Sequence, residues 1–163
     1  MSAFDELLES AAAWASEFAA SEVPSSPARQ LAIVACMDSR LAIRQILGLQ
    51  IGDAHLITNA GGVVTDDTIR SLAISQLRLG TRSIVLIGHT GCGMMTITDE
   101  QFSRQLEEQT GARPGWSAQA FTDLDESLRA SMARLRASPF VPHTDDVRAF
   151  VYDVRTGALR EVE

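Results

Sequence analysis

Two cysteines and one histidine have side chains that together could bind a metal ion. Cys36 follows the apolar run at residues 31–35, and His89 and Cys92 follow the apolar run at residues 83–88. Thiolate sulfur and imidazole nitrogen are ligands that zinc prefers in proteins. Three such ligands leave one coordination position open, as in catalytic zinc sites, whereas structural sites usually close with four Cys or His ligands. The residue types are therefore those of a catalytic Zn²⁺ site.

Two charged residues follow the first cysteine at short spacing. In the segment CMDSR, Asp38 and Arg40 come two and four residues after Cys36, close enough to supply the hydrogen-bonding partners that metal sites normally need. A structural interpretation stands beside this one, because a buried cysteine after a strand often behaves as a small hydrophobic residue. Asp38 and Arg40 would then form a surface ion pair, or Asp38 a helix cap. The spacing alone leaves both interpretations open.

The apolar pattern predicts an α/β fold with a mostly parallel sheet that is flanked by helices. Strands are predicted over residues 31–35, 54–58, 83–88 and 147–154, and helices over residues 4–20, 41–49, 66–79, 98–109 and 118–136. In open α/β sheets the ligand site lies at the carboxyl ends of the strands, where the strand order reverses. Cys36, His89 and Cys92 all follow such ends, so the predicted fold brings them to one edge.

Length and charge limit the possible partners. The chain has 163 residues, which predicts a single domain over residues 1–163, and its formal net charge is −7. No basic patch for a phosphate backbone is present, so we expect no nucleic-acid partner. The acidic N-terminus lacks the features of a secretion signal, and no apolar stretch reaches the length of a membrane span. We therefore expect a cytoplasmic protein, in which two cysteines are thiols or metal ligands rather than a disulfide.

Two short motifs resemble the signatures of the β-class carbonic anhydrases. They are CMDSR at residues 36–40 and GHTGCG at residues 88–93, with the segment NAGG at residues 59–62 between them. The resemblance implies a zinc enzyme with Cys36, His89 and Cys92 as ligands and with Asp38 paired to Arg40. It also allows Asp38 to bind the zinc itself and close the site. The small residues of the second segment, Ala60, Gly61 and Gly62, would border the substrate pocket.

The same resemblance implies a homo-oligomer, a dimer or a tetramer. The helix predicted at the N-terminus, within an arm of residues 1–27, would pack on the neighbouring subunit. The alternative is packing on its own subunit.

The chain departs from the family pattern near the pocket. Pro27 lies near the place of a glutamine that binds substrate in many relatives, and Thr58 replaces a frequent arginine. His55 occupies a pocket position that is often aromatic. His55 could shuttle protons, or it could have only a structural role.

The resemblance favours reversible hydration of carbon dioxide to bicarbonate by a zinc-bound hydroxide, which ionised Asp38 would help to form and orient. The alternative is hydrolysis of carbonyl sulfide, or of a related small heteroallene, by the same nucleophile. A third hypothesis is a zinc-binding module without catalytic activity.

Overall fold

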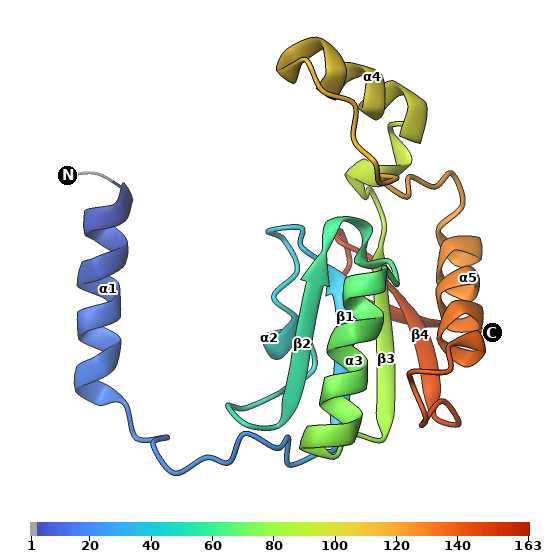
Figure 1. Cartoon of the computed structure of the whole chain (residues 1–163). Coiled ribbons are helices and arrows are strands. Elements are labelled where there is room, and N and C mark those ends of the chain that lie inside the picture. The colour runs from blue at the N-terminus through green and yellow to red at the C-terminus, as the bar shows by residue number, and fades with distance from the viewer. Residues whose placement is uncertain (1–2) are drawn as a thin grey trace.

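A five-stranded sheet forms the centre of the molecule, for which the computed structural model describes residues 3–163 (Figure 1). The strands are β1 (Leu31–Cys36), β2 (Ala54–Asn59), β3 (Ser83–His89), β4 (Val147–Tyr152) and β5 (Leu159–Val162). Their order in the sheet is β2-β1-β3-β4-β5. The first four strands are parallel, and β5 runs antiparallel to β4. The predicted α/β fold with a mostly parallel sheet is confirmed.

Helices and the chain around them bury both faces of this sheet. The helices are α1 (Ala3–Glu17), α2 (Ile43–Ile46), α3 (Asp66–Leu79), α4 (Asp99–Thr110) and α5 (Leu124–Ala137), with short 3₁₀ turns η1 (Ala60–Gly62) and η2 (Gly93–Met95). On one face, Leu72 of α3 and Leu135 of α5 are fully buried in a core shared with alternate residues of β1. The other residues of β1 pack with Ile43 of α2 on the opposite face. β1 is thus buried on both sides, as its continuous apolar run requires.

Three predicted helices are shorter in the structure. The helix predicted over residues 41–49 is a single turn, because Gly48 adopts the left-handed conformation (φ +61°) that commonly ends helices. The helix predicted from residue 118 begins at Leu124, where the Asp123 side chain caps it by accepting the Glu126 N–H. The N-terminal helix, predicted over residues 4–20, ends at Glu17.

The strand β5 is absent from the sequence-based prediction, which ended with a strand over residues 147–154. A turn after β4 reverses the chain and lets β5 pair with β4. The Asp153 carboxylate builds this turn by accepting the N–H groups of Arg155 (2.8 Å) and Thr156 (3.1 Å). Gly157 then takes a positive φ of 76°. These local hydrogen bonds also hold the pKa of Asp153 below its usual value.

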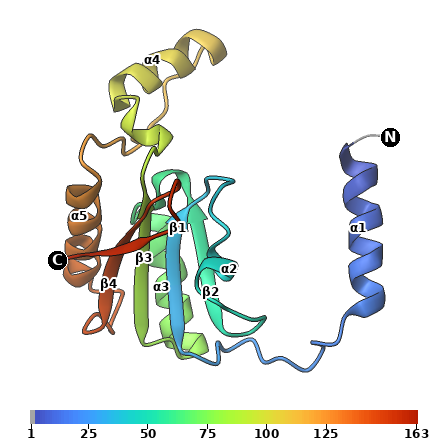
Figure 2. The same cartoon turned by 180° about the vertical axis from the view of Figure 1, so that it is seen from behind.

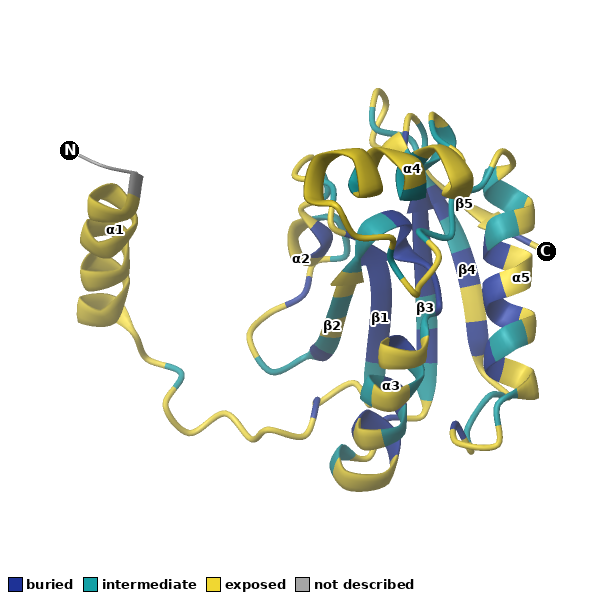
Figure 3. Ribbon diagram, turned by 45° about the horizontal axis from the view of Figure 1, so that its top comes forward, coloured by how far each residue is buried: buried dark blue, intermediate teal, exposed yellow. Residues whose placement is uncertain are grey.

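Two helices lie away from the sheet. Figures 1 and 2 show, from opposite sides, that α1 stands beyond the β2 edge on a long connection and that α4 projects from the end of the sheet. Every described side chain of α1 is exposed, in contrast to the buried strands β1 and β3 (Figure 3). None of the helices within residues 3–163 has both the length and the apolar character needed to cross a membrane.

Candidate metal centre

The residues Cys36, His89 and Cys92 meet at the carboxyl edge of the sheet. Cys36 ends β1 and His89 ends β3, and these two strands are parallel neighbours. Cys92 follows three residues after His89 and immediately precedes η2. The strand order reverses between β1 and β3, which is where open α/β sheets bind ligands. The two sulfur atoms and a ring nitrogen lie within 4.8 Å of one another.

The imidazole of His89 is oriented as a metal ligand. Its Nδ1 lies 3.1 Å from the Thr90 carbonyl oxygen, which can only accept, so Nδ1 carries the proton and Nε2 has a free lone pair. Among the described residues this buried Nε2 has no hydrogen-bond partner. A buried polar atom without a partner costs free energy, and a metal ion would remove that cost. Two buried free thiols beside this lone pair form a donor set that fits Zn²⁺.

The electrostatics of the ligands also fit a cation. Burial lowers the pKa of His89, which favours the neutral imidazole that metals bind. Burial raises the pKa of the Cys92 thiol, so the chain by itself disfavours the thiolate. A metal ion reverses this balance, because metal binding at a thiol is coupled to loss of its proton.

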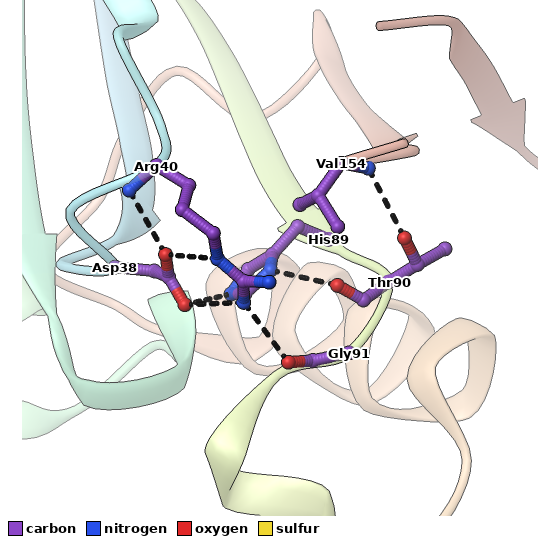
Figure 4. Close-up of polar contacts among 6 residues, drawn as sticks. All are labelled: Asp38, Arg40, His89, Thr90, Gly91 and Val154. Atoms are coloured by element: carbon purple, nitrogen blue, oxygen red, sulfur yellow. Dashed lines mark hydrogen bonds and ion pairs between the residues drawn. The ribbon is translucent and has the colours of Figure 1, made fainter. Parts of the chain in front are cut away.

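The carboxylate of Asp38 lies beside this group and is held by Arg40 (Figure 4). Arg40 donates from Nε to Asp38 Oδ1 and from Nη2 to Oδ2, each at 2.8 Å, and its backbone N–H reaches Oδ1 at 3.0 Å. These hydrogen bonds, the side-chain ones first, hold the pKa of Asp38 far below its usual value. Asp38 Oδ2 is 3.8 Å from His89 Nε2. Both carboxylate oxygens are thus bound by Arg40, and the group formed by Cys36, His89 and Cys92 lies next to them.

The segment NAGG folds against the first cysteine. Asn59 clamps the turn, because its side chain accepts the Val63 N–H (3.0 Å) and donates to the Val63 carbonyl (2.8 Å). Gly62 (φ +65°) packs so closely that a Cβ there would lie 2.7 Å from the backbone nitrogen of Cys36. Ala60 and Gly61 continue the same turn at this edge of the sheet. Only glycine fits at position 62, because a side chain there would collide with the backbone of Cys36.

Within this one copy of the chain, His55 lies away from the three ligand residues. His55 lies near the amino end of β2, whereas Asn59, which pairs with Cys36, is the last residue of that strand. Four residues of strand separate the two positions by about 13 Å. The ring of His55 contacts Ser75 Oγ (2.7 Å) and the Ser25 carbonyl (3.2 Å). Within this chain His55 therefore joins the segment before β1 to helix α3.

Other groups contact the site although the sequence-based prediction gave them no role. The Gly91 carbonyl accepts a hydrogen bond from Arg40 Nη2 at 3.1 Å, and the Met94 backbone N–H donates to Cys92. The Thr90 hydroxyl accepts the Val154 N–H at 3.1 Å. Thr90, Gly91 and Met94 lie within or next to GHTGCG, so the motif predicts that they lie near the site. Val154 comes from the turn after β4, and no motif marked it.

Comparison with known proteins agrees with this geometry. The chain matches the carbonic anhydrase family over residues 31–131. β-Carbonic anhydrase 1 of Mycobacterium tuberculosis is 49% identical over 162 residues, which cover 99% of each chain. The chain belongs to the β-carbonic anhydrase family. The structure of the carbonic anhydrase from Streptococcus mutans matches this β-carbonic anhydrase fold with a TM-score of 0.94 and 43% identity, covering 100% of this chain and 99% of that one.

The β-carbonic anhydrase family also contains relatives with another name. A carbon disulfide hydrolase from an Acidianus species is 34% identical over 157 residues, covering 82% of this chain and 77% of its own. The predicted resemblance is thus confirmed, and the family includes enzymes for a sulfur-containing heteroallene.

Because Gly62 lies against the backbone of Cys36, Gly62→Ala should displace that ligand. We expect Gly62→Ala to lower the free energy of unfolding by more than the roughly 1–2 kcal/mol that a left-handed alanine costs, and to reduce metal uptake. Gly111→Ala is the matched control, since Gly111 has a φ of 75° but no atom within 4 Å of a Cβ. Denaturant unfolding and metal analysis of both variants test this. Equal losses of stability, with full metal uptake by Gly62→Ala, would contradict it.

Proposed function

We propose that this chain catalyses the reversible hydration of carbon dioxide to bicarbonate and a proton, with one zinc ion held by Cys36, His89 and Cys92. The observation that carries this proposal is the buried His89 Nε2, which has no hydrogen-bond partner within the described part of the chain and lies beside two free thiols and the paired Asp38. The full-length similarity to a relative named β-carbonic anhydrase supports the same reaction. In this reaction the oxygen of water bonds to the carbon of carbon dioxide, and the proton of that water is released to solvent.

Bound zinc would supply Lewis-acid chemistry, because it lowers the pKa of a water molecule and makes a nucleophile available near neutral pH. The residues of the chain would do the rest. Asp38, kept ionised by Arg40, can accept a hydrogen bond from the water and so orient an oxygen lone pair toward the substrate carbon. Arg40 keeps the carboxylate in place through its two side-chain contacts. His89 stays neutral, with its proton on the side away from the ligand group.

We also propose a cytoplasmic location for this activity, with no nucleic-acid or membrane partner. Both cysteines are free and buried, and thiols stay reduced in the cytoplasm, which supports this location.

A variant of a zinc ligand and variants of the Asp38–Arg40 pair should lose activity for different reasons. Cys36→Ser removes a thiolate ligand, so zinc and activity should be lost together. Asp38→Asn and Arg40→Ala leave the three ligands intact, so we expect nearly full zinc content with kcat/KM lowered about 10–100-fold. Elemental analysis and stopped-flow hydration on the same preparations measure both quantities.

The matched control for this experiment is Asp145→Asn, which removes an exposed carboxylate in the segment before β4. It should leave both zinc content and hydration unchanged. Full zinc retention by Cys36→Ser would refute the ligand assignment, and a wild-type rate in Asp38→Asn would refute the role of Asp38.

The second candidate reaction is hydrolysis of a sulfur-containing heteroallene, carbonyl sulfide or carbon disulfide, which the Acidianus relative favours. The packing beside the glycine turn supports carbon dioxide instead. A Cβ at Gly61 would lie 3.2 Å from both the Met94 and the Phe121 side chains, and Gly62 lies against Cys36. Side chains and backbone thus occupy the space next to these two glycines, so the turn itself offers no added room for a longer, sulfur-containing substrate.

A comparison of kcat/KM for the different substrates decides between these reactions. On one zinc-quantified preparation, kcat/KM for carbon dioxide hydration should exceed kcat/KM for sulfide release from carbonyl sulfide and from carbon disulfide, because the glycine turn is closely packed. Stopped-flow proton release and a colorimetric sulfide assay provide the two measurements. More efficient sulfide release would replace hydration by heteroallene hydrolysis, with the zinc ligands unchanged.

We further propose that residues 1–27 form an arm whose helix packs on a second copy of the chain, giving a dimer or a larger homo-oligomer. Large apolar side chains of α1 are exposed, among them Phe4 (78%), Leu8 (68%) and Trp14 (61%). An isolated helix of this length is only marginally stable in water. A partner surface would bury its apolar face and supply the missing stabilisation.

Two alanines of α1 allow a matched test of this assembly. Ala11 lies at the centre of the apolar face, and Ala13 lies on the opposite side of the helix. Ala11→Glu should weaken the oligomer, because a charge would be buried, whereas Ala13→Glu should leave its mass unchanged. Light scattering after size-exclusion chromatography measures the mass. A monomeric wild-type chain, or equal behaviour of the two variants, would contradict the proposal.

A further inference from the structure

Among the described residues, the ring of His89 makes one hydrogen bond, with the carbonyl group of the next residue in the chain. The Nδ1 proton is held by the carbonyl oxygen of Thr90 at 3.1 Å. If that carbonyl turned away, Nδ1 would lose its acceptor and the imidazole could take its proton on Nε2. A proton there would occupy the lone pair that faces the two thiols. Whatever fixes the Thr90 peptide therefore also fixes the ligand.

Thr90 is fixed from both its backbone and its side chain. Its N–H donates to the Tyr152 carbonyl at 3.0 Å, which continues the pairing of β3 with β4. Its hydroxyl accepts the Val154 N–H at 3.1 Å (Figure 4). The first contact exists for any residue at position 90 that has an N–H, but the second requires a side-chain acceptor. The hydroxyl thus gives Thr90 a second contact, with Val154, that an apolar side chain could not make.

The donor in this contact is itself held in place. Val154 belongs to the turn between β4 and β5, in which Asp153 N–H donates to the Ala158 carbonyl at 2.9 Å. The Asp153 carboxylate accepts the N–H groups of the two residues after Val154. The Val154 N–H is left facing Thr90, which is its acceptor in the described chain. A chain of hydrogen bonds therefore runs from the β4–β5 turn to the ring of His89.

We propose that Thr90 is a positioning residue for His89: its hydroxyl binds the Val154 N–H and thereby fixes the carbonyl that keeps the imidazole proton on Nδ1. The inference rests on the metal ligands of the proposed function. Thr90 touches neither substrate nor metal in this role and acts only through His89. When a group that holds a metal ligand in place is removed, metal affinity or activity typically falls by about 10–100-fold.

The test measures zinc affinity by competition with a chromophoric chelator. Thr90→Val keeps the shape of the side chain and removes the acceptor, so its zinc dissociation constant should rise about 10–100-fold. Thr90→Ser restores the hydroxyl and should stay close to the wild type. Thr110→Val is the matched control, because it removes a hydroxyl that likewise accepts a backbone N–H, that of Ala112 at 3.3 Å, but at the end of α4 and not on the path to His89.

Two further readouts separate positioning from a merely structural role. The absorption bands of the Co²⁺-substituted chain should change in Thr90→Val and return in Thr90→Ser, since they report ligand geometry. Amide exchange at Val154 should be faster in Thr90→Val than in the wild type, even without metal. If Thr90→Val does not fold, Thr90→Ala removes the same acceptor without adding bulk and should show the same loss of affinity.

A folded Thr90→Val or Thr90→Ala variant with wild-type zinc affinity and an unchanged Co²⁺ spectrum would overturn the inference. A wild-type chain that binds zinc but does not hydrate carbon dioxide would instead overturn the proposed function, and the affinity comparison would still decide the role of Thr90. A wild-type chain that does not bind zinc would overturn both.

Discussion

The burial of two thiols and one imidazole at the same sheet edge is the constraint on which the rest of this site depends. Residues 3–163 offer His89 Nε2 no hydrogen-bond partner, and burial raises the pKa of the Cys92 thiol, so the arrangement by itself costs free energy. A metal ion turns that cost into binding energy, since it satisfies the lone pair and stabilises the thiolates. The sheet must therefore hold the three groups at ligand distance before metal arrives. Parallel strands achieve this, because neighbouring carboxyl ends lie side by side whatever the sequence between them.

Charge around the ligand group is balanced by Arg40. Two thiolates neutralise the formal charge of Zn²⁺, so an unpaired carboxylate beside them would leave the site with a net negative charge. Arg40 offsets Asp38 and keeps it ionised, which preserves a hydrogen-bond acceptor beside the metal. The same guanidinium donates to the Gly91 carbonyl, next to Cys92. One side chain thus connects the first cysteine segment to the second, so that the charge balance and the spacing of the ligands depend on the same residue.

The sequence predicted those parts of the fold that depend on long periodic patterns. The strands β1 and β3 are continuous apolar runs because both of their faces are covered, and helix α3 has matching predicted and observed bounds. The segment at residues 41–49 is apolar too, but it covers one face of the sheet as a single helical turn that Gly48 ends. β5 was missed since only one of its four residues is buried, which leaves little apolar pattern to detect. Its evidence lies in the turn, where the Asp153 side chain bonds its own backbone neighbours.

In the candidate site, too, the sequence predicted what depends on neighbouring residues and missed what depends on distant strands. CMDSR and GHTGCG predicted the ligand group and the Asp38–Arg40 pair, because these residues lie close in sequence to the strand ends that position them. The position of His55 within this chain follows from strand register, which pairs it with Ala32 and sets it near the other end of β2 from Cys36. The contact of Thr90 with Val154 depends on β4 lying next to β3 and on a turn that begins only after β4 ends. A motif records which side chains a site needs, but the register of distant strands decides which backbone groups hold them there.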